Sequence, residues 1–258
     1  MRVILCGALG RMGREMQKQI ARSGKSRVVA AVDRAFEEAV GARSSAEDGL
    51  LCADCKGYAH ISEVQECADV IVDFSHHSAV RELVDFAGAH GLPLVIATTG
   101  HTEEEREYIT RASKDIPIFF CGNMSLGVAL FVSVVAKVAG TFPYADVEII
   151  ETHRKGKADA PSGTALMLAN AVIEARGGEG RIVIGRRDGE RQTGDIGISS
   201  VRMGDVVGEH EVRINTGFQT ITLKHEAHSR AIFAIGAVRA LDFICTKQNG
   251  LYSVKDFL

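Results

Sequence analysis

The first 33 residues constrain the fold of this chain more than any other stretch. An apolar run, Arg2 to Cys6, leads directly into three glycines at positions 7, 10 and 13. A helical pattern follows to about Ser23, and a second apolar run, Val28 to Val32, ends in Asp33. This order of strand, glycine turn, helix, strand and acidic residue is typical of a βαβ unit that binds a dinucleotide.

The glycine spacing alone is weak evidence. It is G-x-x-G-x-x-G rather than the usual G-x-G-x-x-G, and a structural turn without nucleotide is the alternative. In this context the turn would let the backbone approach a pyrophosphate at the helix start, while Asp33 binds a ribose hydroxyl. Arg34 could meet a 2′-phosphate, so the sequence does not choose between NADH and NADPH, and we expect both to be used.

Apolar runs and helical patterns alternate again after residues 35–65, which show no sustained period and are expected to be loop with short irregular pieces. The pattern predicts strands at Val70–Phe74, Leu94–Ala97 and Ile116–Cys121, and helices at Ala79–His90 and Glu103–Ser113. Nearly continuous apolar strands indicate a parallel sheet covered on both faces. The residues at the strand ends, 74–76, 98–100 and 122–125, should therefore line a cofactor crevice, Phe74 among them.

The pattern changes after Asn123. Helices are expected at Leu126–Ala139, Thr164–Arg176 and Ala231–Ile244, and strands at Val147–Glu151, Arg181–Ile184, Ile198–Arg202, Val206–Ile214 and Thr220–His225. Strands that succeed one another without helices indicate an antiparallel or mixed sheet. We predict an α/β protein with a Rossmann-type parallel sheet domain, residues 1–123 plus 237–258, and an α+β domain, residues 124–236. Residues 251–258 are expected to be a tail that packs on the first domain.

A basic segment separates the strand that ends at Glu151 from the next helix. It carries His153, Arg154, Lys155 and Lys157, and it closes with Pro161, Ser162, Gly163 and Thr164. Ser162 is a natural N-cap, after which backbone N–H groups point at the mouth of the helix. Cations beside a helix start suit a small anion with carboxylates or phosphate. A solvated basic turn is the alternative, but the coincidence of the two features favours a site.

Composition excludes several other functions. The net charge of −3 argues against nucleic acid as a partner. Six cysteines are scattered, and Cys52-Ala-Asp-Cys55 has no second pair to complete a zinc site, so we expect reduced thiols and no metal. The apolar run at residues 3–10 is interrupted by glycines and followed by arginines, so we expect a buried strand and a turn rather than a signal peptide. The run at residues 128–136 is too short to span a bilayer. We therefore expect a cytoplasmic protein without membrane contact.

The basic segment resembles the marker of the 4-hydroxy-tetrahydrodipicolinate reductase (dihydrodipicolinate reductase) family, E-x-H-H-x-x-K-x-D-x-P-S-G-T-A. The chain carries Glu151, His153, Lys157, Asp159 and the run from Pro161 to Ala165 in that register. Further matches cover nearly the whole chain, at residues 7–13, 73–75, 98–100, 123–127, 201–210 and 229–239.

The resemblance implies reduction of a cyclic dicarboxylate to tetrahydrodipicolinate in lysine biosynthesis, by a homotetramer built through the mixed sheets of its substrate-binding domain. It implies that His153 donates or accepts a proton and that Lys157 donates one, as both side-chain types can near neutrality. Gly163 and Thr164, with Ser162, Arg154 and Thr99, would bind the substrate. NADH or NADPH would contact a larger set, which comprises Gly7, Ala8, Leu9, Gly10, Arg11, Met12, Asp33, Arg34, Phe74, Ala97, Thr98, Thr99, Cys121, Gly122, Asn123 and Met124.

Three positions depart from the family pattern. Arg154 stands where a second His is usual, Ala97 replaces a glycine, and His77 replaces a common Pro. An Arg can bind a carboxylate through two hydrogen bonds, so substrate binding is expected to be kept. Two alternatives stay open from the sequence: a Rossmann dehydrogenase of another small dicarboxylate, and a nucleotide-sensing binding protein without turnover.

Overall fold

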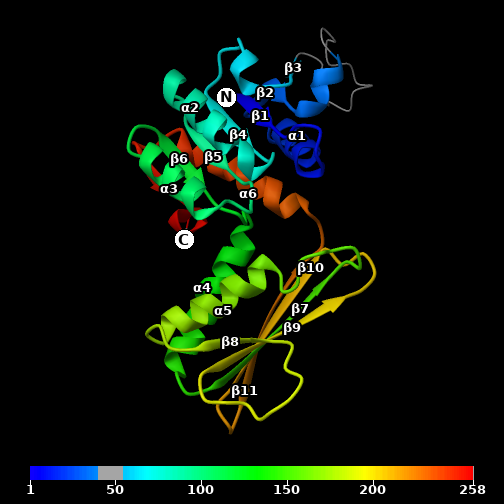
Figure 1. Cartoon of the computed structure of the whole chain (residues 1–258), viewed down its shortest axis with the longest axis vertical. Coiled ribbons are helices and arrows are strands. Elements are labelled where there is room, and N and C mark those ends of the chain that lie inside the picture. The colour runs from blue at the N-terminus through cyan, green and yellow to red at the C-terminus, as the bar shows by residue number, and fades with distance from the viewer. Residues whose placement is uncertain (40–54, 258) are drawn as a thin grey trace. The chain divides into compact units, whose positions relative to one another are not determined.

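The computed structural model describes residues 1–39 and 55–257, which form two compact units. The first contains residues 1–125 and 230–258, and the second contains residues 126–229 (Figure 1). In the described ranges, every helix is too short or too polar to cross a membrane.

The first unit is built on a sheet of parallel strands. Its described strands lie in the order β12-β6-β5-β4-β1-β2-β3, and every neighbouring pair is parallel. The strands are β1 (Arg2–Cys6), β2 (Arg27–Val32), β3 (Lys56–Tyr58), β4 (Val70–Asp73), β5 (Leu94–Ile96), β6 (Pro117–Phe120) and β12 (Gly250–Tyr252). The helices are α1 (Arg11–Ser23), α2 (Val80–His90), α3 (Glu103–Ala112) and α6 (Ala231–Ile244), with short 3-10 turns at Arg34–Ala39, Ile61–Glu63, His77–Ala79 and Val254–Phe257. The predicted Rossmann-type sheet is confirmed.

The strand order reverses between β1 and β4. The chain runs from β1 outward through β2 and β3, then returns to β4 on the other side and continues outward to β6. At such a point the loops after neighbouring strands diverge, and a crevice opens at the carboxyl ends of the strands. The two strands at this point, β1 and β4, are apolar and buried because helices cover the two faces of the sheet.

The glycine turn after β1 is held by close backbone approach. Gly7 has a φ of 72°, and a Cβ at this position would lie 2.5 Å from the carbonyl oxygen of Phe74. A Cβ at position 13 would overlap the carbonyl oxygen of Gly7. Gly7 thus fits the turn against the end of β4, and Gly13 lets α1 begin directly beside the turn.

Two strands of the first sheet were not predicted. Residues 35–65 were expected to be irregular, but Lys56–Tyr58 forms β3 beside β2; residues 40–54, with Cys52, lie outside the described part. Residues 250–252 form β12 beside β6, where only a packed tail was expected. Each run has three residues, too few to show a period, and each is fixed by pairing with a long-range neighbour.

The second unit contains a mixed sheet in the order β11-β10-β7-β9-β8. The pairs β11–β10 and β10–β7 are antiparallel, whereas β7–β9 and β9–β8 are parallel. These strands are β7 (Asp146–His153), β8 (Arg181–Ile184), β9 (Asp195–Arg202), β10 (Gly208–Asn215) and β11 (Thr220–Ala227), and the helices are α4 (Leu126–Thr141) and α5 (Gly163–Ala175). The prediction of a mixed sheet is confirmed.

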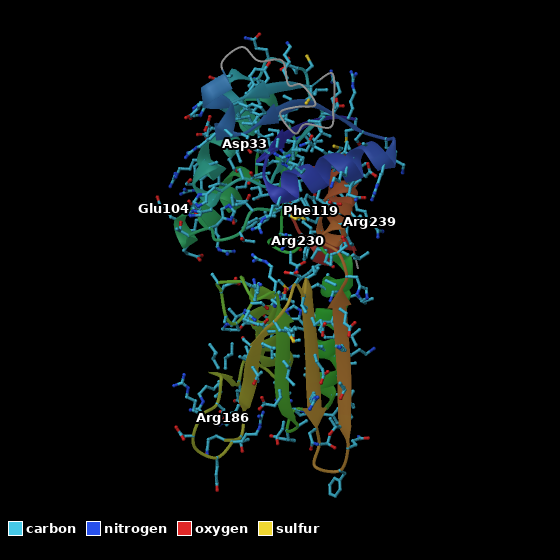
Figure 2. All side chains as sticks on the ribbon, turned by 90° about the vertical axis from the view of Figure 1, so that its right-hand side faces the viewer. Asp33, Glu104, Phe119, Arg186, Arg230 and Arg239 are labelled. Carbon is cyan, nitrogen blue, oxygen red and sulfur yellow. The ribbon has the colours of Figure 1, made fainter. Side chains whose placement is uncertain are left out.

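The two helices α4 and α5 cover one face of this mixed sheet (Figure 1). Along β7 every second side chain, Val147, Ile149 and Glu151, is buried on that face, and the residues between them are more exposed. Figure 2 looks onto the opposite face, which no helix of the described ranges covers. The burial pattern therefore places Glu151 and His153 at the helix-covered face, at the carboxyl end of β7.

We predict that Gly236 supports the loop after β6. A Cβ at position 236 on α6 would overlap the carbonyl oxygen of Met124, so Gly236→Ala should lower the free energy of unfolding by about 1–3 kcal/mol. Gly88→Ala is the matched control, because a Cβ there has no neighbour within 4 Å. The control should be neutral or stabilise by up to about 1 kcal/mol. Urea denaturation of both variants tests this, and equal effects would contradict it.

Candidate active site

The start of α5 is fixed by Ser162. Its Oγ accepts a hydrogen bond from the backbone N–H of Ala165 at 3.2 Å, so the predicted N-cap is confirmed. The side chain of Ser162 is buried. The backbone N–H of Ser162 donates a hydrogen bond to Oε1 of Glu151 at 3.2 Å. Gly163 and Thr164 form the first turn after the cap. The helix start is thereby attached to the end of β7.

Glu151 is a fully buried carboxylate. Nη2 of Arg202 donates to its Oε1 at 2.9 Å and Nη1 donates to its Oε2 at 3.0 Å. Burial alone would raise the pKa of Glu151, but hydrogen bonds from Arg202, Ser200 and His153 outweigh it and lower the pKa to about 2. Glu151 is therefore ionised at neutral pH, and it gives this part of the site a fixed negative charge.

His153 lies directly beside this carboxylate. Its Nδ1 contacts Oε2 of Glu151, and its side chain is 11% exposed. Burial and the charges of Lys157 and Arg202 lower the pKa of His153, while Glu151 opposes the shift. A Cβ at position 208 would lie 3.0 Å from Nε2 of His153, so Gly208 leaves room at that nitrogen.

His210 connects the helix cap with His153. Its Nε2 lies 3.0 Å from Oγ of Ser162, and its ring packs edge-to-face on His153 with the centroids 5.2 Å apart. Burial, followed by the charge of His153, lowers the pKa of His210 to about 4. Oγ of Ser162 thus accepts from the Ala165 N–H and is hydrogen-bonded to Nε2 of His210, so it connects the start of α5 with β10.

The cations of the basic segment take different positions. Nζ of Lys157 donates to both carboxylate oxygens of Asp159 at 2.8 Å, and the Asp159 carbonyl accepts from Arg202. Arg154 is partly buried, and its carbonyl accepts from the Lys157 N–H. Lys155 is exposed. The charge of Lys157 acts on His153 and on His210, which contacts the cap of α5, so these groups lie near one another. Arg154 belongs to the same segment, and a Cβ at Gly156 would lie 2.7 Å from its Nη1.

Three charged or polar residues of the site were not predicted to be functional: Glu151, Arg202 and His210. Glu151 and the stretches around Arg202 and His210 were recognised as family matches, without a role for any of the three. The sequence shows only that these charged or polar residues lie at the ends of apolar strands. Strand pairing places Arg202 beside His153 and His210 opposite Glu151, so the register of the strands is needed to predict that they form one site.

The first unit contains a cavity of about 290 Å³ next to the glycine turn. Five residues from the predicted cofactor set line it, namely Gly7, Gly10, Asp33, Arg34 and Phe74. Its other lining residues are Cys6, Val32, Ala59, His60, Ile61, Ser75, His76, Ser78, Ala79, Glu82 and Leu83. The cavity therefore lies at the carboxyl ends of β1, β2 and β4.

Asp33, labelled in Figure 2, connects the end of β2 to the glycine turn. Its Oδ2 accepts from the N–H of Leu9 at 3.0 Å and its Oδ1 accepts from the N–H of Ala35 at 3.2 Å. Gly10 begins α1 without a side-chain cap. A helix start that lacks a side-chain acceptor suits an anion, since its first N–H groups keep their donor capacity.

The remaining cofactor candidates lie around this turn or at two other strand ends, outside the cavity lining. Ala8 and Leu9 belong to the turn, and Arg11 and Met12 to the first turn of α1. Ala97, Thr98 and Thr99 follow β5, where Thr98 donates to the buried carboxylate of Asp73 at 2.6 Å. Cys121, Gly122, Asn123 and Met124 follow β6, and a Cβ at position 122 would lie 3.1 Å from Thr99. The parallel pairing of β5 and β6 brings these two loops together.

Two of the departures from the family pattern have clear contacts. His77 places its Nδ1 3.0 Å from both carboxylate oxygens of Glu105. Ala97 is buried, and its N–H donates to the carbonyl of Asp73 at 2.9 Å. The side chain of His77 and the backbone of Ala97 are thus each hydrogen-bonded within the first unit.

Comparison with known proteins gives matches over the whole chain. The family model "Dihydrodipicolinate reductase, N-terminus" matches residues 1–124, and "Dihydrodipicolinate reductase, C-terminus" matches residues 127–258. The 4-hydroxy-tetrahydrodipicolinate reductase of Caldanaerobacter subterraneus subsp. tengcongensis is 39% identical, with 100% of this chain and 98% of that protein covered. The enzyme of the same name from Clostridium novyi is 34% identical, with 100% and 98% covered.

A solved structure has the same fold. It is dipicolinate-bound dihydrodipicolinate reductase from Paenisporosarcina sp. TG-14, with a TM-score of 0.80 and 24% identity. The match covers 100% of this chain and 99% of that one. At this identity the likeness describes the arrangement of the elements alone.

Proposed function

The chain belongs to the dihydrodipicolinate reductase family, and from this premise we propose which of its residues perform the reaction. Its activity is that of a 4-hydroxy-tetrahydrodipicolinate reductase, an oxidoreductase of lysine and diaminopimelate biosynthesis. The N-terminal domain of this family binds a nucleotide. We assign NADH or NADPH to residues 1–123 plus 237–258, and the substrate and the oligomer interface to residues 124–236.

Lys157 is the proton donor of the proposed reaction, and His153 donates or accepts a proton through Nε2. The cofactor, when bound, supplies a hydride. Hydride addition leaves electron density on the substrate ring that a nearby acid must neutralise. The ammonium of Lys157 is held by Asp159, and Nε2 of His153 faces the space that Gly208 leaves open. The observation that carries the proposal is the placement of both groups beside the helix start of α5.

The start of α5 binds one substrate carboxylate in this proposal. The first N–H groups after Ser162 and the partial positive charge of the helix start attract an anion. Gly163 and Thr164 supply the first turn, and Arg154 adds a guanidinium in the preceding segment. Thr99 of the other unit remains a proposed substrate contact from the family resemblance. A dicarboxylate such as dipicolinate, which is bound in the Paenisporosarcina enzyme, fits this set of donors.

The cofactor is proposed to bind in the cavity beside the glycine turn. Gly7 and Gly10 provide a wall without side chains, and the uncapped start of α1 provides donors for a pyrophosphate. Asp33 retains acceptor capacity for a ribose hydroxyl because a carboxylate has about four lone-pair sites and two of them are used. Leu9, Ala97, Cys121 and their neighbours complete the proposed contacts.

The oligomer is proposed to be a homotetramer that forms through the uncovered face of the mixed sheet. Antiparallel and mixed sheets commonly bury only one face within a domain. Here Val201 on the uncovered face is 38% exposed, and Met203 after β9 is 56% exposed. Sedimentation equilibrium should give four times the chain mass of 27.7 kDa, and a monomer mass would refute the proposal. A cytoplasmic location follows from the biosynthetic role and is likewise proposed.

We predict that His153→Ala and Lys157→Ala each lower kcat by about 10²–10⁴-fold, the usual effect of removing a positioned acid or base. The dissociation constant for the cofactor should change little, because the nucleotide cavity is built from other residues. Lys155→Ala removes an exposed cation of the same segment and should keep normal turnover. Steady-state kinetics with freshly generated substrate measures all three. Near-normal kcat in the first two variants would remove them from the chemistry.

We predict that Thr164→Val raises KM more than it lowers kcat, because it removes the Thr164 hydroxyl from ground-state binding of the carboxylate while the backbone N–H groups remain. Arg154→His should stay active, and Arg154→Glu should raise KM sharply by repelling the anion. Titration with pyridine-2,6-dicarboxylate gives binding without turnover. Unchanged affinity in Arg154→Glu would place the carboxylate elsewhere.

We predict that NADH and NADPH both bind, with NADH at least comparable. Asp33 accepts from a free 2′-hydroxyl and repels a 2′-phosphate, whereas Arg34 offsets the repulsion. Asp33→Asn keeps an acceptor for the Leu9 N–H and removes the charge, so it should improve NADPH relative to NADH. Isothermal titration at two salt concentrations tests this. A selectivity ratio that is identical in wild type and Asp33→Asn would show that Asp33 does not face the ribose.

A further inference from the structure

We infer that Glu151 is a positioning residue for both parts of the proposed site: one carboxylate oxygen orients His153, and the other holds the start of α5. The inference deepens the proposed function and rests on it, because His153 and the helix start are the groups proposed to exchange a proton and to bind a carboxylate. Glu151 itself is fully buried and is not proposed to contact the substrate.

The contacts divide between the two oxygens. Oε1 accepts from the N–H of Ser162 at 3.2 Å and from Nη2 of Arg202 at 2.9 Å. Oε2 accepts from Nη1 of Arg202 at 3.0 Å and contacts Nδ1 of His153. Arg202 thus fixes the plane of the carboxylate through two parallel hydrogen bonds. A rotation of that plane would disturb the histidine and the helix cap together.

The charge of Glu151 selects the tautomer of His153. An ionised carboxylate accepts hydrogen bonds and cannot donate one, so Nδ1 of His153 carries a hydrogen. Nε2 is then the nitrogen that exchanges a proton, with a lone pair in the neutral ring and a hydrogen in the charged one. This is the nitrogen at which Gly208 leaves room. The same logic orients the imidazole in Ser-His-Asp hydrolases, where the carboxylate fixes the tautomer.

The groups around His153 act on it in opposite directions. Glu151 on β7 favours the charged imidazole, whereas Lys157 in the following segment and Arg202 on β9 disfavour it. His210 on β10 packs edge-to-face against the ring and is itself kept neutral near pH 7 by burial, which lowers its pKa to about 4. Removal of the Glu151 charge therefore removes the carboxylate that raises the pKa of His153, while the charges of Lys157 and Arg202 still lower it.

A purely structural role is the competing explanation. Buried Glu151 would then only neutralise Arg202, and its loss would destabilise the fold without changing the protonation of His153. Asp195 offers a matched control for this case, since it is a buried carboxylate of the same sheet with two arginine partners, Arg181 and Arg186. Asp195 is the first residue of β9 and Arg202 is the last, so the control lies at the opposite end of the strand from Glu151 and its partner. Arg186 lies in the loop between β8 and β9 (Figure 2).

The experiment compares Glu151→Gln with Asp195→Asn in the full-length protein. The Gln carbonyl can keep the bond from Ser162, while its NH₂ group faces Nδ1 of His153 and donates to it. In ¹⁵N-histidine spectra, the neutral His153 signal, identified by its loss in His153→Gln, should change from the Nδ1–H to the Nε2–H tautomer. In kinetics, kcat should fall at least about 100-fold. KM should change less than kcat, and the inflection of the pH profile that belongs to His153 should move to lower pH.

Asp195→Asn should lower the midpoint of thermal unfolding and leave the tautomer, kcat and the pH profile as in wild type. If Glu151→Gln fails to fold because Arg202 loses its charge partner, Glu151→Gln/Arg202→Met removes both charges and carries the tautomer and kcat readouts. The pH profile is read in the single variant alone, because the Arg202 charge itself lowers the pKa of His153. An unchanged Nδ1–H tautomer or an unchanged pH profile in the Glu151 variant would overturn the inference. Normal kcat in His153→Ala would instead refute the proposed function, since the tautomer measurement needs no turnover.

Discussion

A carboxylate without access to water must be surrounded by donors, and this requirement organises the second unit around Glu151. Burial of an unpaired charge costs far more than a single hydrogen bond returns. The donors come from three elements: Arg202 at the end of β9, His153 at the end of β7, and the Ser162 N–H at the start of α5. The end of the sheet and the start of the helix are therefore fixed by one group. The site is assembled at that point because the ends of three elements must meet there.

The first unit depends on a different constraint, the close approach of backbone to backbone. Gly7 lies against the carbonyl of Phe74, and Gly13 lies against the carbonyl of Gly7. These contacts leave no room for side chains at the reversal of strand order, so the crevice has bare peptide groups along one wall. Peptide N–H groups are suitable partners for phosphate oxygens. In the proposed function the two units therefore bind anions through the same kind of donor, the N–H groups at a helix start. In the first unit this start is Gly10 without a side-chain cap, and in the second it is capped by Ser162.

Much of this arrangement could be predicted from the sequence. The strand–glycine–helix order predicted the βαβ unit, and Ser162 predicted the start of α5, because both signals are local and depend on neighbouring residues. The short strands β3 and β12 were missed because three residues carry no period and their pairing partners are distant in the chain. The family resemblance supplied roles for His153 and Lys157.

The supporting residues of the site were beyond sequence reasoning for a related reason. Arg202 is 51 residues from Glu151, and only the parallel pairing of β7 with β9 places it at the same end of the sheet. His210 becomes a partner of Ser162 through the antiparallel register of β10 with β7. Strand register is a long-range property that apolar periodicity does not specify. A charged residue at a strand end is thus recognisable from sequence, whereas its partner is not.

The hydrogen bond between Asp33 and the Leu9 N–H has a consequence for how this enzyme could change its cofactor during evolution or by design. The carboxylate at position 33 accepts a hydrogen bond from the turn and also lines the cavity in which the cofactor is proposed to bind. A substitution there that removes the acceptor would loosen the turn, so only a residue such as Asn, which still accepts from the Leu9 N–H, can change selectivity without this loss. Among the described hydrogen bonds that hold the turn, none is made by the side chain of Arg34. In the proposed binding mode, a change at residue 34 could therefore alter the preference between NADH and NADPH and keep the hydrogen bond of Asp33 to the turn, whereas most changes at residue 33 would lose that bond.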